Sequence, residues 1–178
     1  HYKTLFAGYD VVGLDYHADN PWEAISEFKE FFHGYRKGHD SIILIANSIG
    51  AYFSMCAFNH EQIDKAFFIS PIVDMEKLIL DMMGWADITE EKLREKQLIT
   101  TGFGETLSWE YLCYVRNHPV NWSVPTYILY GNKDNLTSQE TIHKFANDVN
   151  AELTIMQNGE HWFHTAEQMA FLDDWIRG

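Results

Sequence analysis

The strongest signal for the fold lies in SIILIANSIGAYFSMCAF, residues 41–58. Its first part, residues 41–46, is almost continuously apolar, as expected of a strand that is covered on both faces of a parallel sheet. Small residues then surround a single serine, Ser48, and an apolar helix is expected over residues 51–59. The pattern therefore predicts a sharp turn from strand to helix that points the Ser48 hydroxyl outward.

The residues around this serine read Ala46, Asn47, Ser48, Ile49 and Gly50, which is the G-x-S-x-G arrangement with alanine at the first glycine. We attribute the small residues to crowding, because the positions two before and two after the serine are expected to meet in such a turn. A helix that starts behind the serine directs N–H groups and positive dipole toward the hydroxyl. The Ile49 N–H is therefore a candidate oxyanion donor.

Strand-like and helical segments alternate along the chain. The five β-like runs are residues 10–16, 41–46, 65–70, 126–130 and 152–156. This alternation, with right-handed crossovers, predicts an α/β fold: an open, mostly parallel sheet with helices on both faces. In such a sheet the functional groups gather at the carboxyl ends of the strands.

Capping patterns mark the expected helix starts. Asn20, Pro21 and Glu23 supply an N-cap, a first-turn proline and an N3 carboxylate. The helix that they start is expected to end near Gly34, because glycine is common after the last helical residue. The other expected N-caps are Asp87, Ser108, Thr137 and Thr165.

Residues 82–122 interrupt the alternation of strands and helices. They hold helical patterns at 88–97 and 109–117 and a glycine pair in TTGFGET, but no convincing strand. We interpret this region as a helical cap insertion over the edge of the sheet. The domain organisation expected from the sequence is a single domain over residues 1–178 that contains this insertion.

Composition restricts the function classes. The chain has 178 residues, of which 46% are hydrophobic, as expected of one globular domain. A net charge of -13 argues against a nucleic-acid partner. Cys56 and Cys113 are too few for a disulfide framework and fit a reducing cytoplasm. No apolar run reaches the roughly 18 residues of a membrane span. No metal or cofactor is expected, and five histidines are interpreted as solvated or capping: His33, His39, His60, His118 and His143.

A serine nucleophile needs a base, and the base needs an acid that orients it. Asp134 follows the strand at 126–130, and His161 lies in the loop before the last helix. The order Ser48, Asp134, His161 matches nucleophile, acid and base. Alternatives stay open at this point: His164 as the base, Asp74 as the acid, or Asp134 as an Asx-turn residue only.

The segments YGNKD, residues 130–134, and GEHWF, residues 159–163, make the chain similar to the α/β-hydrolase superfamily, in particular to bacterial esterases and lysophospholipase-like members. The resemblance implies a three-layer fold, a nucleophile elbow at Ser48 and a catalytic triad with Asp134 and His161. It implies a serine esterase that acts on a small-molecule acyl substrate, for which the acidic surface favours a neutral ester. The alternatives are a thioesterase, lysophospholipase or peptidase with the same triad, or a noncatalytic binding protein.

The resemblance also identifies departures from the family pattern. The family usually has eight strands, and the five runs correspond to the last five, so the first strands and the loop with the second oxyanion donor are expected to be missing. Side chains that are expected to line a substrate pocket come from the loop after the first run and from the insertion. They are Tyr16, His17, Trp85, Phe103 and Trp109.

Overall fold

The structure is a computed structural model that describes residues 1–59 and 62–178, so His60 lies outside the described residues. The elements before the projecting segment are α1 (Tyr2–Leu5), α2 (Pro21–Arg36), β1 (Ile43–Asn47), α3 (Ile49–Ala57) and β2 (Lys65–Ile69). The next are α4 (Met75–Trp85), α5 (Glu90–Lys96), β3 (Leu98–Thr100), β4 (Thr106–Ser108) and α6 (Trp109–Asn117). The last are β5 (Thr126–Gly131), α7 (Gln139–Asp148), β6 (Glu152–Met156) and α8 (Ala166–Arg177).

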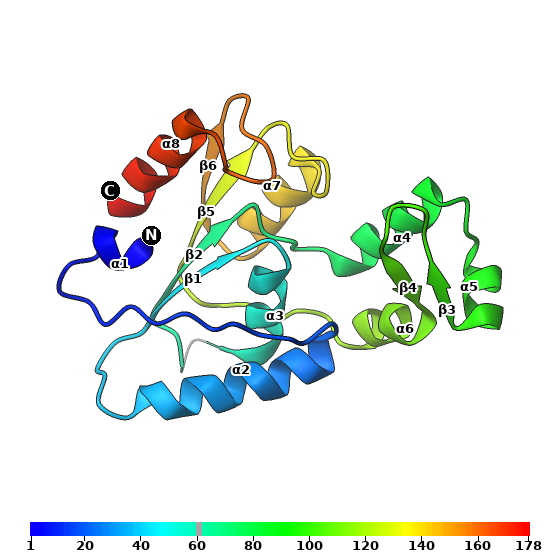
Figure 1. The fold of residues 1–178 in the computed structure, drawn as a ribbon, viewed down its shortest axis with the longest axis horizontal. Helices are drawn as coiled ribbons and strands as arrows, with labels where there is room; N and C mark the ends of the chain where they lie inside the picture. Colours follow the sequence, from blue (N-terminus) through cyan, green and yellow to red (C-terminus); the bar gives the residue numbers. More distant parts are fainter. Residues whose placement is uncertain (60–61) are drawn as a thin grey trace.

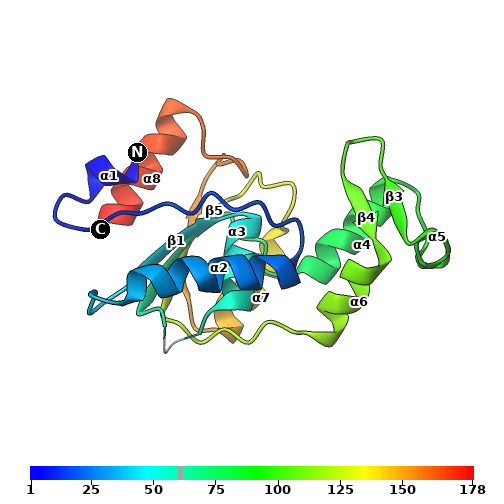
Figure 2. The same ribbon diagram turned by 60° about the horizontal axis from the view of Figure 1, so that its bottom comes forward.

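The main sheet has four strands in the order β1-β2-β5-β6, and every neighbouring pair is parallel. Helices α1 and α8 cover one face of this sheet, and α2, α3 and α7 cover the other (Figures 1 and 2). The expected three-layer α/β fold is therefore confirmed. In the described part of the chain, no helix combines the length and the apolar character that crossing a membrane requires.

Two apolar cores explain why the strands read as continuous apolar runs. Phe68 of β2 and Ile128 of β5 are fully buried in the core that includes α3. Ile69 and Leu129, one position further along each strand, belong to the second core with Leu172 of α8. Successive strand residues point to opposite faces. A sheet that is covered on both faces therefore needs apolar residues at every position.

The expected strand at residues 10–16 is not formed. This segment has no strand pairing in the structure and passes the sheet as extended chain (Figure 1). Val12 in this segment is 40% exposed. The backbone N–H groups of His17 and Ala18, just after it, donate to the Glu27 carboxylate at 3.1 and 3.2 Å. A side chain of α2 therefore holds the end of this segment.

The structure confirms three of the expected N-caps and corrects two. Thr137 does not cap α7, because its hydroxyl donates to the Pro71 carbonyl at 3.2 Å; Ser138 is the cap instead. Asp87 lies in a turn with φ 53, and Thr89 caps α5. Helix α2 also continues two residues beyond Gly34, to Arg36. The confirmed caps are Asn20, Ser108 and Thr165.

Helices α4, α5 and α6 and strands β3 and β4 form a projection beside the main sheet (Figures 1 and 2). The expectation of no strand within residues 82–122 is wrong, because β3 and β4 pair as an antiparallel hairpin. Its turn contains Gly104 at φ 96, a conformation that favours glycine. The hairpin was missed because each strand has only three residues. Helix α4, which also belongs to the projection, begins at Met75.

Candidate active site

Ser48 is the single residue between β1 and α3, and its backbone is strained. Its φ and ψ are 51° and -130°, a region that residues with a side chain rarely adopt. The Ser48 N–H donates to the Ile69 carbonyl at 3.1 Å, and the Ser48 carbonyl accepts from Ile72 N–H at 3.1 Å. The end of β2 therefore holds the serine in this turn. Helix α3 begins at Ile49, two residues earlier than expected, so its first N–H groups lie directly after the serine.

His161 lies between the side chains of the other two predicted site residues. Its Nε2 is 2.8 Å from Ser48 Oγ, and its Nδ1 is 2.8 Å from Asp134 Oδ2. The side chains of His161 and Asp134 are 2% and 0% exposed. With the Nδ1 proton donated to the carboxylate, Nε2 can accept the proton of the serine hydroxyl. The fold thus joins three residues that are separated by 113 and 27 positions in the sequence.

Asp134 is held by its own loop. Its Oδ1 accepts from the N–H groups of Leu136 at 2.8 Å and Thr137 at 3.1 Å, which leaves Oδ2 for His161. Asp134 can therefore form an Asx turn with one carboxylate oxygen and contact His161 with the other. Burial and the nearby Asp134 carboxylate raise the pKa of Tyr130 to about 12. The Tyr130 hydroxyl stays protonated and donates to the Thr137 carbonyl at 2.8 Å, which supports the same loop.

The alternative acid and base have other contacts. Asp74 is exposed and caps α4 by accepting from Lys77 N–H at 2.9 Å. His164 is exposed, and its Nδ1 lies 2.6 Å from the Trp162 carbonyl oxygen. Within residues 1–59 and 62–178, neither side chain makes a hydrogen bond to His161. Four of the histidines interpreted as solvated or capping are exposed in the structure: His33, His39, His118 and His143.

Of the two pocket candidates that precede α2, only Tyr16 lies next to the nucleophile turn. Its hydroxyl lies 3.6 Å from the position that a Cβ would take at Gly50, and its ring packs edge-on against Phe28. Burial raises the pKa of Tyr16, with a further contribution from the Glu27 carboxylate. The His17 side chain is 86% exposed.

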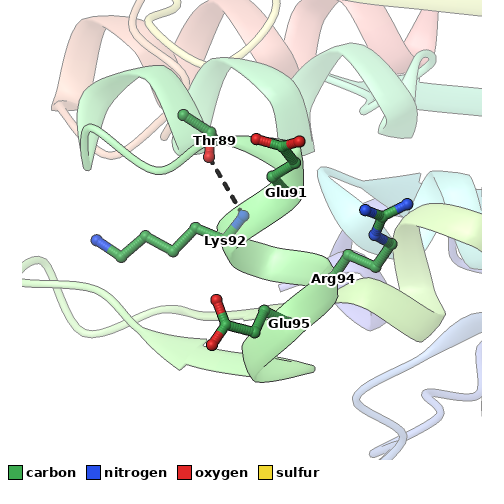
Figure 3. A pocket seen from close by; sticks show the side chains of 5 residues that line it. All are labelled: Thr89, Glu91, Lys92, Arg94 and Glu95. Carbon is green, nitrogen blue, oxygen red and sulfur yellow. Dashed lines mark hydrogen bonds between the residues drawn. The ribbon is translucent and has the colours of Figure 1, made fainter.

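The other pocket candidates lie on the projection. Trp85 and Phe103 form an edge-to-face pair with ring centroids 6.2 Å apart and are 54% and 48% exposed. Trp109 begins α6 and is half-buried. A hollow on α5, shown in Figure 3, is formed by other side chains and includes no predicted site residue. Its lining residues are Thr89, Glu91, Lys92, Arg94 and Glu95.

The crowding expected at Gly50 is absent. Among residues 1–59 and 62–178, a Cβ at this position would meet only Tyr16, at ordinary contact distances of 3.6 and 4.0 Å. Gly50→Ala is therefore expected to raise the free energy of unfolding by about 0.5 kcal/mol, because alanine is favoured over glycine in a helix. Urea denaturation of the two proteins measures this difference. A destabilisation of about 1 kcal/mol or more would restore the crowding interpretation.

Two glycines that the sequence analysis did not single out hold the site loops together. A Cβ at Gly131 would lie 2.4 Å from the carbonyl carbon and oxygen of Gly159, so only glycine fits this position. Gly131 ends β5, and Gly159 lies two residues before His161. Gly131 lies in the quoted segment YGNKD and Gly159 in the quoted segment GEHWF. Their place in the two segments that carry Asp134 and His161 is the sequence feature by which they could have been found.

The Cys56 thiol lies on α3, the helix that follows Ser48. Burial raises the pKa of the Cys56 thiol to about 11, although a hydrogen bond with Tyr52 lowers it, so the thiol is protonated at neutral pH. Among the residues that the structure describes, no group of three or more His, Cys, Asp or Glu side chains is arranged to hold a metal ion.

No protein-family model matches the sequence, and no curated protein matches it. Solved structures do match. Est1E from Butyrivibrio proteoclasticus is 15% identical with a TM-score of 0.70, over 89% of this chain and 68% of that one. A hydrolase from Agrobacterium vitis is 13% identical with a TM-score of 0.71, over 97% and 73%. Mouse alpha/beta hydrolase domain-containing protein 10 is 14% identical with a TM-score of 0.64, over 85% and 67%. The chain has the α/β-hydrolase fold.

Proposed function

We propose that the chain is a serine hydrolase that cleaves carboxylic esters through an acyl-enzyme on Ser48. One observation carries the proposal: two hydrogen bonds of 2.8 Å join Ser48 to His161 and His161 to Asp134. A buried carboxylate, an imidazole and a strained serine in this order are the parts that activate a hydroxyl for attack on a carbonyl.

In the proposed reaction, Ser48 Oγ attacks the acyl carbonyl as its proton passes to His161 Nε2. The bond to the alcohol then breaks, and His161 returns the proton to the leaving oxygen. Water attacks the acyl-enzyme by the same proton path, which releases the acid and restores Ser48. Asp134 fixes the imidazole orientation and stabilises its charged form.

The N-terminus of α3 is the proposed site for the developing oxyanion. The first N–H groups of a helix have no partner within the helix, and Ile49 N–H is the first of α3. Such donors stabilise the negative charge that forms on the carbonyl oxygen. Removing one donor of this kind typically costs about 100- to 1000-fold in rate.

The proposed substrate is a small neutral ester. A net charge of -13 disfavours anionic substrates near the protein surface. One neighbour, Est1E, has ferulic acid bound in a solved structure, so an aromatic acyl group belongs among the substrates to be tested. We propose no cofactor, because the reaction needs only the three side chains and water.

Labelling with a fluorophosphonate tests the proposed function. The folded protein is expected to react at Ser48, because the reagent requires an activated serine, whereas heat-unfolded protein and Ser48→Ala are expected not to react. Peptide mass spectrometry identifies the labelled residue. A panel of alkyl esters, hydroxycinnamate esters, thioesters and amides then defines the acyl group. A folded protein that neither reacts with the reagent nor cleaves any member would be a noncatalytic binding protein.

A further inference from the structure

The loops that carry Asp134 and His161 meet at a junction that contains neither residue. Gly131 and Gly159 pack backbone against backbone there. A Cβ at Gly131 would come within 2.4 Å of the Gly159 carbonyl group and 2.9 Å of Glu160 N, and a Cβ at Gly159 would come within 3.0 Å of Gly131 Cα. These neighbours are backbone atoms, so a side chain at Gly131 cannot be accommodated unless one loop moves.

Backbone hydrogen bonds extend the junction on both sides. Asn132 N–H donates to the Met156 carbonyl at 3.1 Å, and Lys133 N–H donates to the Gly159 carbonyl at 2.8 Å. Asp134 N–H then donates back to the Gly131 carbonyl at 2.9 Å, which closes the turn that bears the carboxylate. The junction therefore fixes the chain directly before Asp134 against the chain directly before His161.

The Asn132 side chain links the same two loops a second time. Its Oδ1 accepts from Asn158 N–H at 2.7 Å, and its Nδ2 donates to Gln157 Oε1 at 2.7 Å. Asn158 has φ 62, a conformation that costs free energy in residues with a side chain. The bond from Asn158 N–H helps to hold this turn. Asn132 is exposed, so its substitution leaves the apolar core intact.

We propose that this junction, formed by Gly131, Gly159 and Asn132, is a positioning device that sets the separation between the Asp134 carboxylate and the His161 imidazole. The inference rests on the proposed function, because it concerns the distance across which the acid orients the base. The junction fixes the chain segments from which the Asp134 and His161 side chains extend. Because these side chains are 2.8 Å apart, a small movement of either loop would break their hydrogen bond. A misplacement of about 1 Å at such a site can cost about 100-fold in rate.

Gly131→Ala tests the proposal, with Gly34→Ala as the matched control. In the part of the chain that the structure describes, a Cβ at Gly34 on α2 meets nothing within 4 Å. Gly131→Ala is expected to lower kcat and the rate of fluorophosphonate labelling about 100-fold with little change in KM. The low-field proton resonance of the His161 Nδ1–H is expected to disappear. Gly34→Ala is expected to match the parent protein in each measurement. A folded Gly131→Ala that keeps the resonance and the parent rates overturns the proposal.

Asn132→Ala decides the question if Gly131→Ala does not fold, since it adds no atoms. Asn132→Ala is expected to keep the melting temperature within a few degrees of the parent value. It is expected to lower the labelling rate about tenfold and to weaken the His161 Nδ1–H resonance. A variant with the parent labelling rate and the parent resonance overturns the proposal. The resonance also separates this inference from the proposed function, because it reports the contact between His161 and Asp134 whether or not the protein is active. A parent protein that is inert but shows the resonance contradicts only the proposed function.

Discussion

Replacing Ser48 or His161 is expected to lower ester turnover by about 10⁴- to 10⁶-fold in a protein that stays folded. Ser48→Ala removes the atom that we propose attacks the carbonyl. His161→Ala removes the imidazole that lies 2.8 Å from Ser48 Oγ and is the proposed acceptor of its proton. Initial rates with the best ester of the panel measure the loss, and circular dichroism confirms the fold. Activity within about tenfold of the parent in either variant would remove that residue from its proposed role.

Two further variants make this experiment specific. His161→Ala leaves the buried Oδ2 of Asp134 without its partner, which costs about 1–3 kcal/mol, so His161→Gln serves as a second variant that can still donate to the carboxylate. His164→Ala is the matched control, because His164 is exposed and contacts the Trp162 carbonyl. The control is expected to retain the parent rate within about threefold.

Asp134→Asn is expected to lower turnover by about 10⁴-fold. The substituted amide can donate to His161 Nδ1, which moves the imidazole proton to Nε2 and prevents Nε2 from accepting the Ser48 proton. Kinetics at several pH values, with thermal unfolding of each variant, measure the effect. The hydrogen bonds from Leu136 and Thr137 to Oδ1 are expected to keep the loop in place.

Asp74→Asn is the control for this variant, since asparagine caps a helix as well as aspartate does. It is expected to leave turnover close to that of the parent because Asp74 caps α4. A mild effect of Asp134→Asn together with a severe effect of Asp74→Asn would transfer the role of the acid to Asp74.

Much of the main sheet was predictable because its signals are local. The apolar runs at 41–46 and 126–130 are both strands in the structure. In β5, burial on both faces requires apolar residues along the strand. The run at 10–16 resembles them but forms no strand in the structure, so an apolar run by itself does not decide strand formation. The hairpin of β3 and β4 was missed for the opposite reason: its three-residue strands carry too short a pattern.

Short sequence segments are enough to predict which chemical groups follow the strands and in what order: Ser48 after β1, Asp134 after β5 and His161 after β6. Adjacent residues encode a strand end and the turn after it, so these positions are visible in local patterns. That Asp134, and not Asp74, contacts His161, and that Gly131 meets Gly159, depends on the folded chain. Such contacts join distant segments through the packing of the whole sheet, and no local pattern records the distance between them.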